Sequence, residues 1–288
     1  MKKPNFFVIG APKCGTTSLY HWLKQHPYAF LPGLKEPHFF NTDDKAPDRC
    51  SLAAYENLFE DAGDADIAVG ECSVWYLASK EAVPRVLDYN PDARFIVCLR
   101  NPIEMAYALH HQQLFAANEH IVSFRAAWQA QDLRARMKDE PAATSTHLLY
   151  GPMCKLGEQV ERLKSHASDD RIHIMFLDDM KEDPSAAYRG ILEFLGLPDF
   201  QPEFRKSNEA RARRLPFIRR IVRGLGSVRR SLGVRRGFGI LSRLDRWNSK
   251  PGRWRPDEGM NETLCSYFRD DIRLLGRMTG RDLTHWLR

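Results

Sequence analysis

The chain has 288 residues, 43% of them apolar and 28% charged, with a formal net charge of +6 at pH 7. This composition supports a buried core and excludes a disordered or fibrous chain, and the length fits one large α/β domain or two small ones. No apolar run approaches the roughly 20 residues of a membrane span, and the run after Met1–Asn5 is too short for a signal peptide.

Short apolar strands alternate with helices along the chain. We predict strands at residues 6–10, 67–70, 94–99 and 171–177, and helices at 16–26, 79–88, 103–117, 122–138, 156–167 and 186–195. Strands separated by helices predict an α/β fold, a central parallel sheet with helices on both faces. Ligands of such sheets bind beyond the carboxyl ends of the strands. The candidate site loops therefore follow Ile9, Gly70, Leu99 and Leu177.

The loop after the first strand carries the strongest signal. It reads Gly10-Ala-Pro-Lys13-Cys-Gly15-Thr16-Thr17-Ser18 and opens a helix. Small residues at a helix start direct backbone N–H groups at an anion, which the helix dipole also favours. An NTPase phosphate loop has lysine directly after its second glycine, then a magnesium-binding hydroxyl, but here Thr16 follows Gly15. The loop is predicted to bind a phosphate-like anion without a metal ion. The alternative is an ordinary glycine turn capped by threonine.

Two further loops hold candidate charged residues. Arg100 ends the third predicted strand, where its planar fork suits a second phosphate, although an arginine there is often only a surface ion pair. Glu36, in the segment Lys-Glu-Pro-His-Phe-Phe, is a candidate general base whose pKa apolar surroundings would raise. The alternative is a solvated loop glutamate. His38 is the second candidate base; the alternative is that it simply packs with the two phenylalanines.

Together these segments resemble the sulfotransferases that use 3′-phosphoadenosine-5′-phosphosulfate (PAPS), nearest to the heparan sulfate glucosamine sulfotransferases and their bacterial relatives. The matching stretches are FFVIGAPKCGTTSLYHWLKQHP for the 5′-phosphosulfate loop, KEPHFF for the base segment, GECSVWYL, IVCLRNPIEMAYA for the 3′-phosphate motif, and SKPGRWRPDEGMNETLCSYF for a late cofactor loop and final helix. The resemblance runs over nearly the whole chain. It implies a three-layer, P-loop-like sulfotransferase fold in a single domain over residues 1–288.

The resemblance also implies roles for individual residues. Lys13 would stabilise charge on the leaving phosphate, Arg100 would bind the 3′-phosphate, and Glu36 would take the proton of an acceptor hydroxyl or amine. The remaining residues expected to hold PAPS are Cys14, Gly15, Thr16, Thr17, Ser18, Lys250, Gly252 and Arg253. Those expected at the acceptor are His38, Glu71 and Ser73, and no metal ion is expected. The neighbouring His110 and His111 could face the acceptor, although such a pair on a helix is more often structural.

This chain departs from the family pattern at four positions. Met105 and Ala108 stand where the family usually has arginine and serine, so 3′-phosphate binding would depend more on Arg100 and the late basic loop. Pro251 interrupts the family's lysine-glycine-arginine sequence. Cys72 replaces a lysine that the heparan sulfate enzymes use near substrate, which weakens the case for a heparin-like acceptor.

Positive charge is concentrated in one segment. Residues 205–255 carry 17 Lys or Arg and two acids, a net +15, which leaves the rest of the chain near −9. Three interpretations stay open. The segment could form a mobile, solvated lid over an anionic cofactor, which we favour; its amphipathic part, residues 211–236, could lie on an anionic membrane; or it could bind an anionic glycan. No nucleic-acid recognition motif accompanies the charge.

We therefore predict a PAPS-dependent sulfotransferase that acts on a carbohydrate-containing or small-molecule acceptor. A non-catalytic nucleotide- or polyanion-binding relative is the alternative, supported by Met105 and Ala108. A small kinase is a third, opposed by the displaced lysine and the missing magnesium hydroxyl. The six cysteines show no CxxC pairing and no clustering with histidine, so we expect a reduced, cytoplasmic protein without structural zinc or disulfides.

Overall fold

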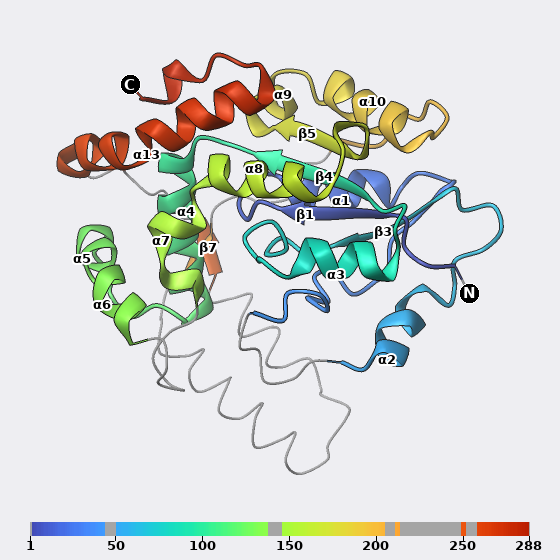
Figure 1. Cartoon of the computed structure of the whole chain (residues 1–288), viewed down its shortest axis with the longest axis horizontal. Helices are drawn as coiled ribbons and strands as arrows, with labels where there is room; N and C mark the ends of the chain where they lie inside the picture. Colours follow the sequence, from blue (N-terminus) through green and yellow to red (C-terminus); the bar gives the residue numbers. More distant parts are fainter. Residues whose placement is uncertain are drawn as a thin grey trace, which may run out of the picture.

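A computed structural model of the chain describes residues 2–43, 50–137, 146–204, 211–213, 249–251 and 258–287. Its centre is a five-stranded sheet in the order β2-β3-β1-β4-β5, in which every paired strand is parallel (Figure 1). The strands are Phe6–Gly10 (β1), Ala29–Phe30 (β2), Ala68–Cys72 (β3), Arg94–Leu99 (β4) and Ile172–Phe176 (β5). The predicted parallel α/β sheet is confirmed.

Helices cover both faces of this sheet: α3 and α8 lie in front of it and α1 lies behind it (Figure 1). The helices are Thr16–Leu23 (α1), Leu52–Glu56 (α2), Ala82–Tyr89 (α3), Pro102–Ala116 (α4), Phe124–Gln129 (α5), Gln131–Arg136 (α6), Tyr150–Met153 (α7), Leu156–His166 (α8), Leu177–Glu182 (α9), Pro184–Leu195 (α10) and Glu258–Thr279 (α13). Single 3-10 turns span Asn57–Phe59, Thr146–Leu148, Asp169–Arg171 and Thr284–Leu287. Two short antiparallel strands, Arg211–Arg213 (β6) and Ser249–Pro251 (β7), form a separate ribbon, and β6 lies against α4.

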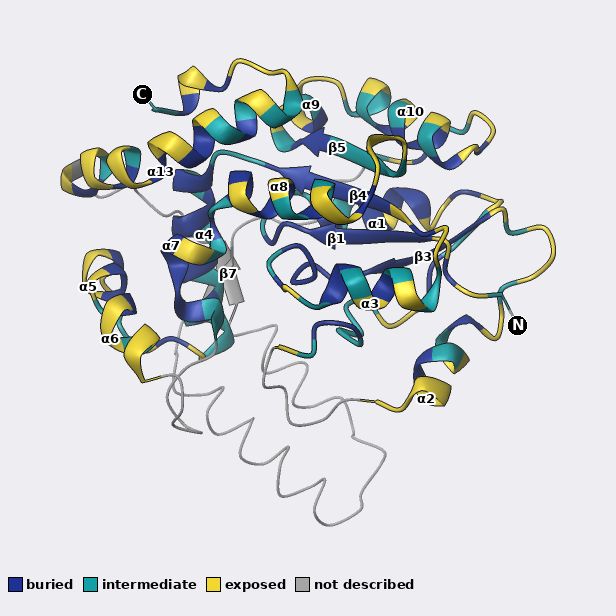
Figure 2. Ribbon diagram, in the orientation of Figure 1, coloured by how far each residue is buried: buried dark blue, intermediate teal, exposed yellow. Residues whose placement is uncertain are grey.

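The core is centred on the middle strands. All five residues of β1 are buried, as is β4 from Phe95 to Leu99, which explains their unbroken apolar sequences (Figure 2). Gly70 on β3 pairs with Phe6 on β1, and a Cβ at Gly70 would lie 1.9 Å from the Phe6 ring. Glycine at this position lets the aromatic ring lie directly on the neighbouring strand.

Several element boundaries differ from prediction for local reasons. The helix predicted from Ser79 begins at Ala82, because the Ser79 hydroxyl accepts the N–H groups of Glu81 (3.2 Å) and Ala82 (3.0 Å) in a turn that precedes the helix. The single helix predicted at 122–138 is two helices, α5 and α6, within the described residues. At their junction the buried Gln131 side chain accepts the Gly151 N–H (2.9 Å) instead of facing solvent. The fourth predicted strand ends at Phe176, where α9 begins.

Most of the predicted basic insert, residues 205–255, lies outside the described residues, apart from β6 and β7. The predicted lid and the 211–236 membrane segment therefore stay predictions. Within the described ranges, no helix is long and apolar enough to cross a membrane. All six cysteines are free thiols, and Cys50 alone among them is exposed.

Candidate active site

The loop between β1 and α1 leaves its amides available to a ligand. Gly15 sits at the N-cap of α1 with φ +92°, a left-handed conformation that glycine adopts without cost. Within the described part of the chain, the N–H groups of Gly15, Thr16 and Thr17 have no backbone acceptor, as expected for the first turn of a helix. Thr17 and Ser18 are partly exposed beside them. The loop thus presents unpaired donors at the positive end of a helix dipole.

Arg100 lies beside this loop at the end of β4. Its Nη1 donates to the Lys13 carbonyl oxygen (3.1 Å), and its Nη2 pairs with the carboxylate of Glu104 one helical turn further along. Its Nε is buried without a partner among the described residues. A buried, unpartnered N–H of a guanidinium is unfavourable unless a ligand supplies an acceptor. Arg100 is therefore placed to bind an anion held near Lys13.

Lys13 carries a positive charge that no described carboxylate pairs within 4 Å. Burial of its side chain, and then the neighbouring charge of Arg100, lower the pKa of Lys13 from the ordinary 10.5. The charges of Glu36 and Lys35 also act on Lys13. The predicted residues Lys13 and Arg100 therefore lie together at the carboxyl edge of the sheet.

Cys14 was predicted to contact the cofactor, but its side chain faces the protein interior. It is fully buried, with its Sγ 3.9 Å from the sulfur of Met105, and its N–H donates to Ala11 (3.3 Å). Burial raises the pKa of the Cys14 thiol to about 12. Cys14 thus packs the loop onto α4, where one of its contacts is Met105, a residue that departs from the family pattern.

The segment with Glu36 lies next to the loop, and Cys72 joins the two. The Glu36 N–H donates to the Cys72 carbonyl (2.9 Å), while the Cys72 Sγ lies 4.0 Å from the Thr16 carbonyl oxygen. The Glu36 carboxylate pairs with Lys35 through one oxygen and with His38 Nε2 (3.4 Å) through the other. Lys35 is a charged residue of the site that was not predicted, although it precedes Glu36 directly.

The predicted rise in the pKa of Glu36 is wrong. Burial alone would raise it, but the hydrogen bond to His38 and the charge and hydrogen bond of Lys35 outweigh burial and lower the pKa of Glu36 to about 2. The carboxylate is therefore ionised at neutral pH. An ionised carboxylate is the form that a general base requires.

Glu71 and Ser73, predicted at the acceptor, are both buried, with 0% and 1% of their surface exposed. One Glu71 oxygen accepts hydrogen bonds from the hydroxyls of Tyr55 (2.7 Å) and Tyr76 (3.3 Å). The Ser73 hydroxyl accepts the His38 N–H (3.0 Å). Neither side chain reaches the surface, so both lie beneath the site.

The remaining predicted residues divide into two groups. The backbone of Lys250 belongs to β7, in the ribbon whose partner strand β6 lies against α4, whereas Gly252 and Arg253 lie outside the described residues.

On α4, His110 is buried and its ring shares a hydrogen bond with the Ile121 carbonyl (2.9 Å), a structural role. Burial and the charge of Lys13 lower the pKa of His111, which is partly exposed on α4.

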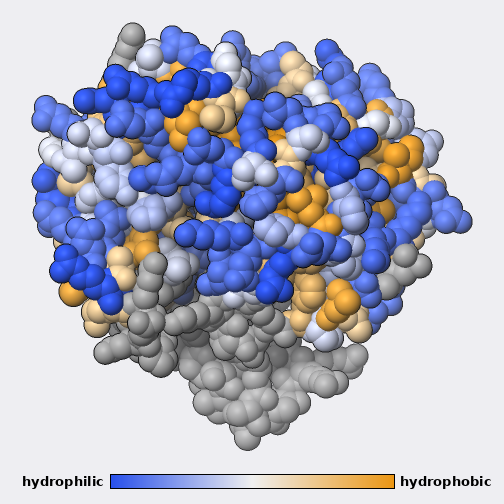
Figure 3. Space-filling model, in the orientation of Figure 1, coloured by the Kyte–Doolittle hydropathy of each residue, from blue (hydrophilic) through white to orange (hydrophobic). Residues whose placement is uncertain are grey.

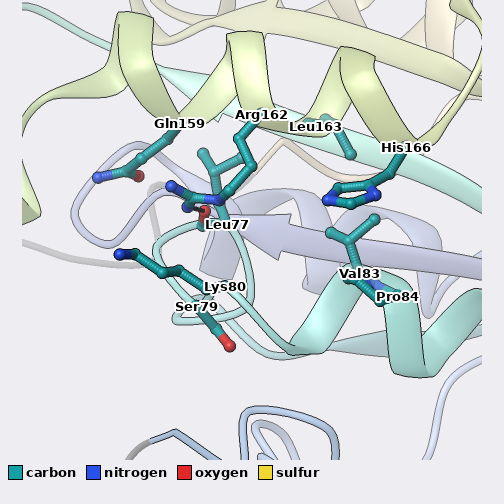
Figure 4. A pocket seen from close by; sticks show the side chains of 9 residues that line it. All are labelled: Leu77, Ser79, Lys80, Val83, Pro84, Gln159, Arg162, Leu163 and His166. Atoms are coloured by element: carbon teal, nitrogen blue, oxygen red, sulfur yellow. Dashed lines mark hydrogen bonds between the residues drawn. The ribbon is translucent and has the colours of Figure 1, made fainter.

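Other hollows in the described residues lie away from Lys13, Arg100 and Glu36; one of about 300 Å³ is lined by residues of β5, α8 and α13, among them Ile174, Phe176 and Met278. A furrow between α3 and α8 holds polar side chains (Figure 4), but its free space is too small for a water molecule. Arg162 there donates to the carbonyls of Leu77 (2.6 Å) and Ala78 (3.1 Å), which makes it a structural brace. The face shown in Figure 3 is mostly polar, with small scattered apolar areas. No group of His, Cys, Asp or Glu side chains among the described residues could hold a metal ion.

Residues 3–219 match the family described as "Sulfotransferase domain". The chain belongs to this sulfotransferase family. Among curated proteins it is 31% identical to human carbohydrate sulfotransferase 15, over 36% of this chain and 26% of that protein. It is also 34% identical to human heparan sulfate glucosamine 3-O-sulfotransferase 6, over 43% of this chain and 34% of that protein. The matches thus span about a quarter to a third of the length of these relatives.

The fold agrees with this membership. A crystal structure of a sulfotransferase from Alicyclobacillus acidocaldarius superposes over 100% of both chains with a TM-score of 0.76 and 24% sequence identity. The predicted sulfotransferase fold, and the family resemblance on which it depended, are confirmed. In this sulfotransferase, Lys13, Glu36 and Arg100 lie at the loop between β1 and α1 (residues 10–18, the anion loop).

Proposed function

We propose that this sulfotransferase transfers the sulfuryl group of PAPS to a hydroxyl, or less readily an amine, of a carbohydrate-containing or small-molecule acceptor. The observation that carries the proposal is the convergence of Lys13, Arg100 and Glu36 at the carboxyl edge of the sheet. Two cations beside unpaired helix amides suit an anionic donor, and an ionised carboxylate next to them suits deprotonation of an acceptor.

The residues present fit PAPS as a donor. The amides of Gly15, Thr16 and Thr17 suit a 5′-phosphate, and the buried Nε of Arg100 suits a second phosphate. PAPS, when bound, supplies an activated sulfuryl group on a phosphate leaving group. The Cys14 side chain packs against Met105, and the predicted place of Cys14 in the cofactor set stays a prediction.

The chain's own residues then have separate tasks. Glu36 accepts the proton of the acceptor, and Lys13 stabilises the negative charge that develops beside the loop. By analogy with phosphoryl transfer, positioning and electrostatic stabilisation would supply most of the rate enhancement. Both groups are held in place by neighbours, Lys13 through the bond from Arg100 to its carbonyl and Glu36 through its ion pairs.

A carbohydrate acceptor is supported by the names of the curated relatives, a carbohydrate sulfotransferase and a heparan sulfate glucosamine 3-O-sulfotransferase. Cys72, which stands where the heparan sulfate enzymes have lysine, is 2% exposed and cannot supply a cation to an acceptor. We therefore propose a less highly charged glycan or glycolipid. We also propose a cytoplasmic location, with residues 211–236 as the part that would contact an anionic membrane.

Thermal unfolding with adenosine 3′,5′-bisphosphate tests the donor. A ligand at 100 times its Kd stabilises a protein by about 2.7 kcal/mol, so the wild type should show a clear rise in Tm. Lys13→Ala and Arg100→Ala should abolish that rise, whereas Arg85→Ala, at an exposed ion pair on α3, should keep it. No rise for the wild type at millimolar ligand would refute the donor assignment.

Transfer of labelled sulfate from PAPS to a panel of sugars and small alcohols tests catalysis. Glu36→Gln should lower kcat by about 10²–10⁴-fold while it keeps the Tm rise with bisphosphate. A Tm rise with no transfer to any acceptor would instead favour the non-catalytic nucleotide-binding alternative. Met105 in the family's arginine position, buried against Cys14, is the feature that supports that alternative.

A further inference from the structure

The base segment, defined here as residues 35–40, is held against the end of β3 by a regular set of hydrogen bonds. Every second amide of the segment donates to the last residue of β3 or to the turn that follows it: Glu36 to the Cys72 carbonyl (2.9 Å), His38 to the Ser73 hydroxyl (3.0 Å) and Phe40 to the Tyr76 hydroxyl (3.1 Å). Two of the three acceptors are side-chain oxygens. The course of the segment therefore depends on which side chains occupy positions 73 and 76.

The backbone of this segment needs such support. Glu36 and His38 have φ values of +64° and +52°, a left-handed conformation that is unfavourable for residues with a Cβ. Such conformations persist where surrounding contacts impose them, and they gather at functional sites. The hydrogen bonds that the backbone amides of the segment donate to Cys72, Ser73 and Tyr76 supply these contacts. They fix the direction in which the Glu36 carboxylate points.

Glu71 anchors this arrangement from below. It is fully buried, and one of its oxygens accepts the hydroxyl protons of Tyr55 and Tyr76. Because the Tyr76 hydroxyl donates its hydrogen bond to Glu71, the hydroxyl oxygen can accept the Phe40 N–H. Tyr55 stacks on Phe39 with ring centroids 4.5 Å apart and an interplanar angle of 13°. Glu71 thus holds both aromatic side chains that fix the far end of the base segment.

We propose that Glu71, Ser73 and Tyr76 are positioning residues that hold Glu36 and His38 in the geometry required for proton transfer from the acceptor. The inference depends on the proposed function for the role of Glu36. None of the three reaches the surface, since their exposed fractions are 0%, 1% and 0%. They therefore act through the base segment and do not contact the acceptor themselves.

Tyr76→Phe is the main test, because it removes one hydroxyl and keeps the ring. Tyr188→Phe is the matched control: Tyr188 is 1% exposed, and among the described residues its hydroxyl donates to the Trp22 carbonyl (3.5 Å), away from the base segment. Hydrogen exchange of the peptide over residues 35–42 should become about five- to tenfold faster in Tyr76→Phe, as for loss of one backbone hydrogen bond. It should not change in Tyr188→Phe.

Turnover of PAPS supplies the second measurement. Tyr76→Phe and Ser73→Ala should lower kcat by about 10- to 100-fold, the effect of a small misplacement of a reacting group, and leave the Tm rise with bisphosphate unchanged. Glu71→Gln keeps an acceptor for both tyrosines, so its kcat should stay within about fivefold of the wild type, whereas Glu71→Ala should fall like Tyr76→Phe.

The inference would be overturned by unchanged exchange in Tyr76→Phe, by an equal loss of kcat in Tyr188→Phe, or by a Gln variant of Glu71 as impaired as the Ala variant. Loss of the bisphosphate Tm rise in parallel with kcat would also overturn it, because the network would then support the whole site. A wild-type protein that transfers no sulfate refutes the proposed function, and with it the catalytic part of this inference. The exchange measurement separates that failure from failure of the network itself.

Discussion

Gly15→Ala should destabilise the protein through two separate effects that the structure allows us to add. Gly15 has φ +92°, and a Cβ there would lie 2.8 Å from the Met180 sulfur and 3.1 Å from a Leu177 methyl. The left-handed backbone costs about 1–2 kcal/mol for a residue with a Cβ, and the overpacking costs about 1–3 kcal/mol. We expect a loss of about 2–5 kcal/mol in the free energy of unfolding, measured by urea denaturation.

Two other glycines separate these effects. Gly196 has φ +67° and open space around it, so Gly196→Ala should show only the backbone cost of about 1–2 kcal/mol. Gly33 has neither a positive φ nor a neighbour within 4 Å, so Gly33→Ala should be close to neutral. Met180→Ala in the Gly15→Ala background should restore part of the packing loss. If Gly15→Ala were no less stable than Gly196→Ala, the close contact between α9 and the anion loop would be refuted.

Three other predictions concern carboxylates. Asp271 on α13 accepts the N–H groups of Gly157 and Glu158 at the start of α8 (3.0 and 2.9 Å); Asp271→Ala should cost about 1–3 kcal/mol in urea denaturation, and an unchanged midpoint would contradict this cap. The pKa of Glu36, about 2, lies below the ordinary 4.5, so its ion pairs stabilise the fold above pH 4.5 and lose that effect as pH falls toward 2. The stability difference between wild type and Glu36→Gln, about 1 kcal/mol for a carboxylate one-third exposed, should shrink as pH falls through this range; a constant difference would show that the ion pairs are absent. Burial raises the pKa of Glu71, a shift opposite in direction to that of Glu36. Glu71 therefore favours the folded state while it is neutral, and this stabilisation is lost as pH rises and the carboxyl ionises. Glu71→Gln should therefore gain stability relative to wild type in urea denaturation as pH rises above 4.5, and a fixed difference would argue against buried ionisation.

The sequence was most informative where local pattern and fold agree. The bounds of β1 and β4 were predicted without error, because strands buried on both faces leave unbroken apolar runs. The anion loop was also predicted from residues that are adjacent in the chain, a strand, a lysine, a glycine and hydroxyls before a helix. The position of Arg100 near the loop was predicted in the same way, because the carboxyl ends of parallel strands meet at one edge of the sheet.

Side-chain environments were predicted less well, because they depend on contacts between distant segments. Glu71 and Ser73 are polar residues at the end of a strand, a pattern that suggests a surface site. Their burial depends on Tyr55, which approaches from α2, and on the return of the base segment over β3. The pKa of Glu36 was predicted in the wrong direction for a similar reason. The left-handed backbone at Glu36 and His38 accompanies contacts of the carboxylate with Lys35 and the His38 ring, which outweigh the effect of the apolar surroundings that the sequence suggested.

The charges around Glu36 link its basicity to the anion loop. A carboxylate with a pKa of about 2 is ionised but accepts a proton weakly. The Lys35 cation lowers its pKa, and the charges of Lys35 and Glu36 both act on Lys13 in the loop. An anion bound at Lys13 would offset the positive field at Glu36 and raise the pKa of the carboxylate. On the proposed function, Glu36 would thus become a stronger base when the anionic donor is in place, at the moment when a proton has to be removed.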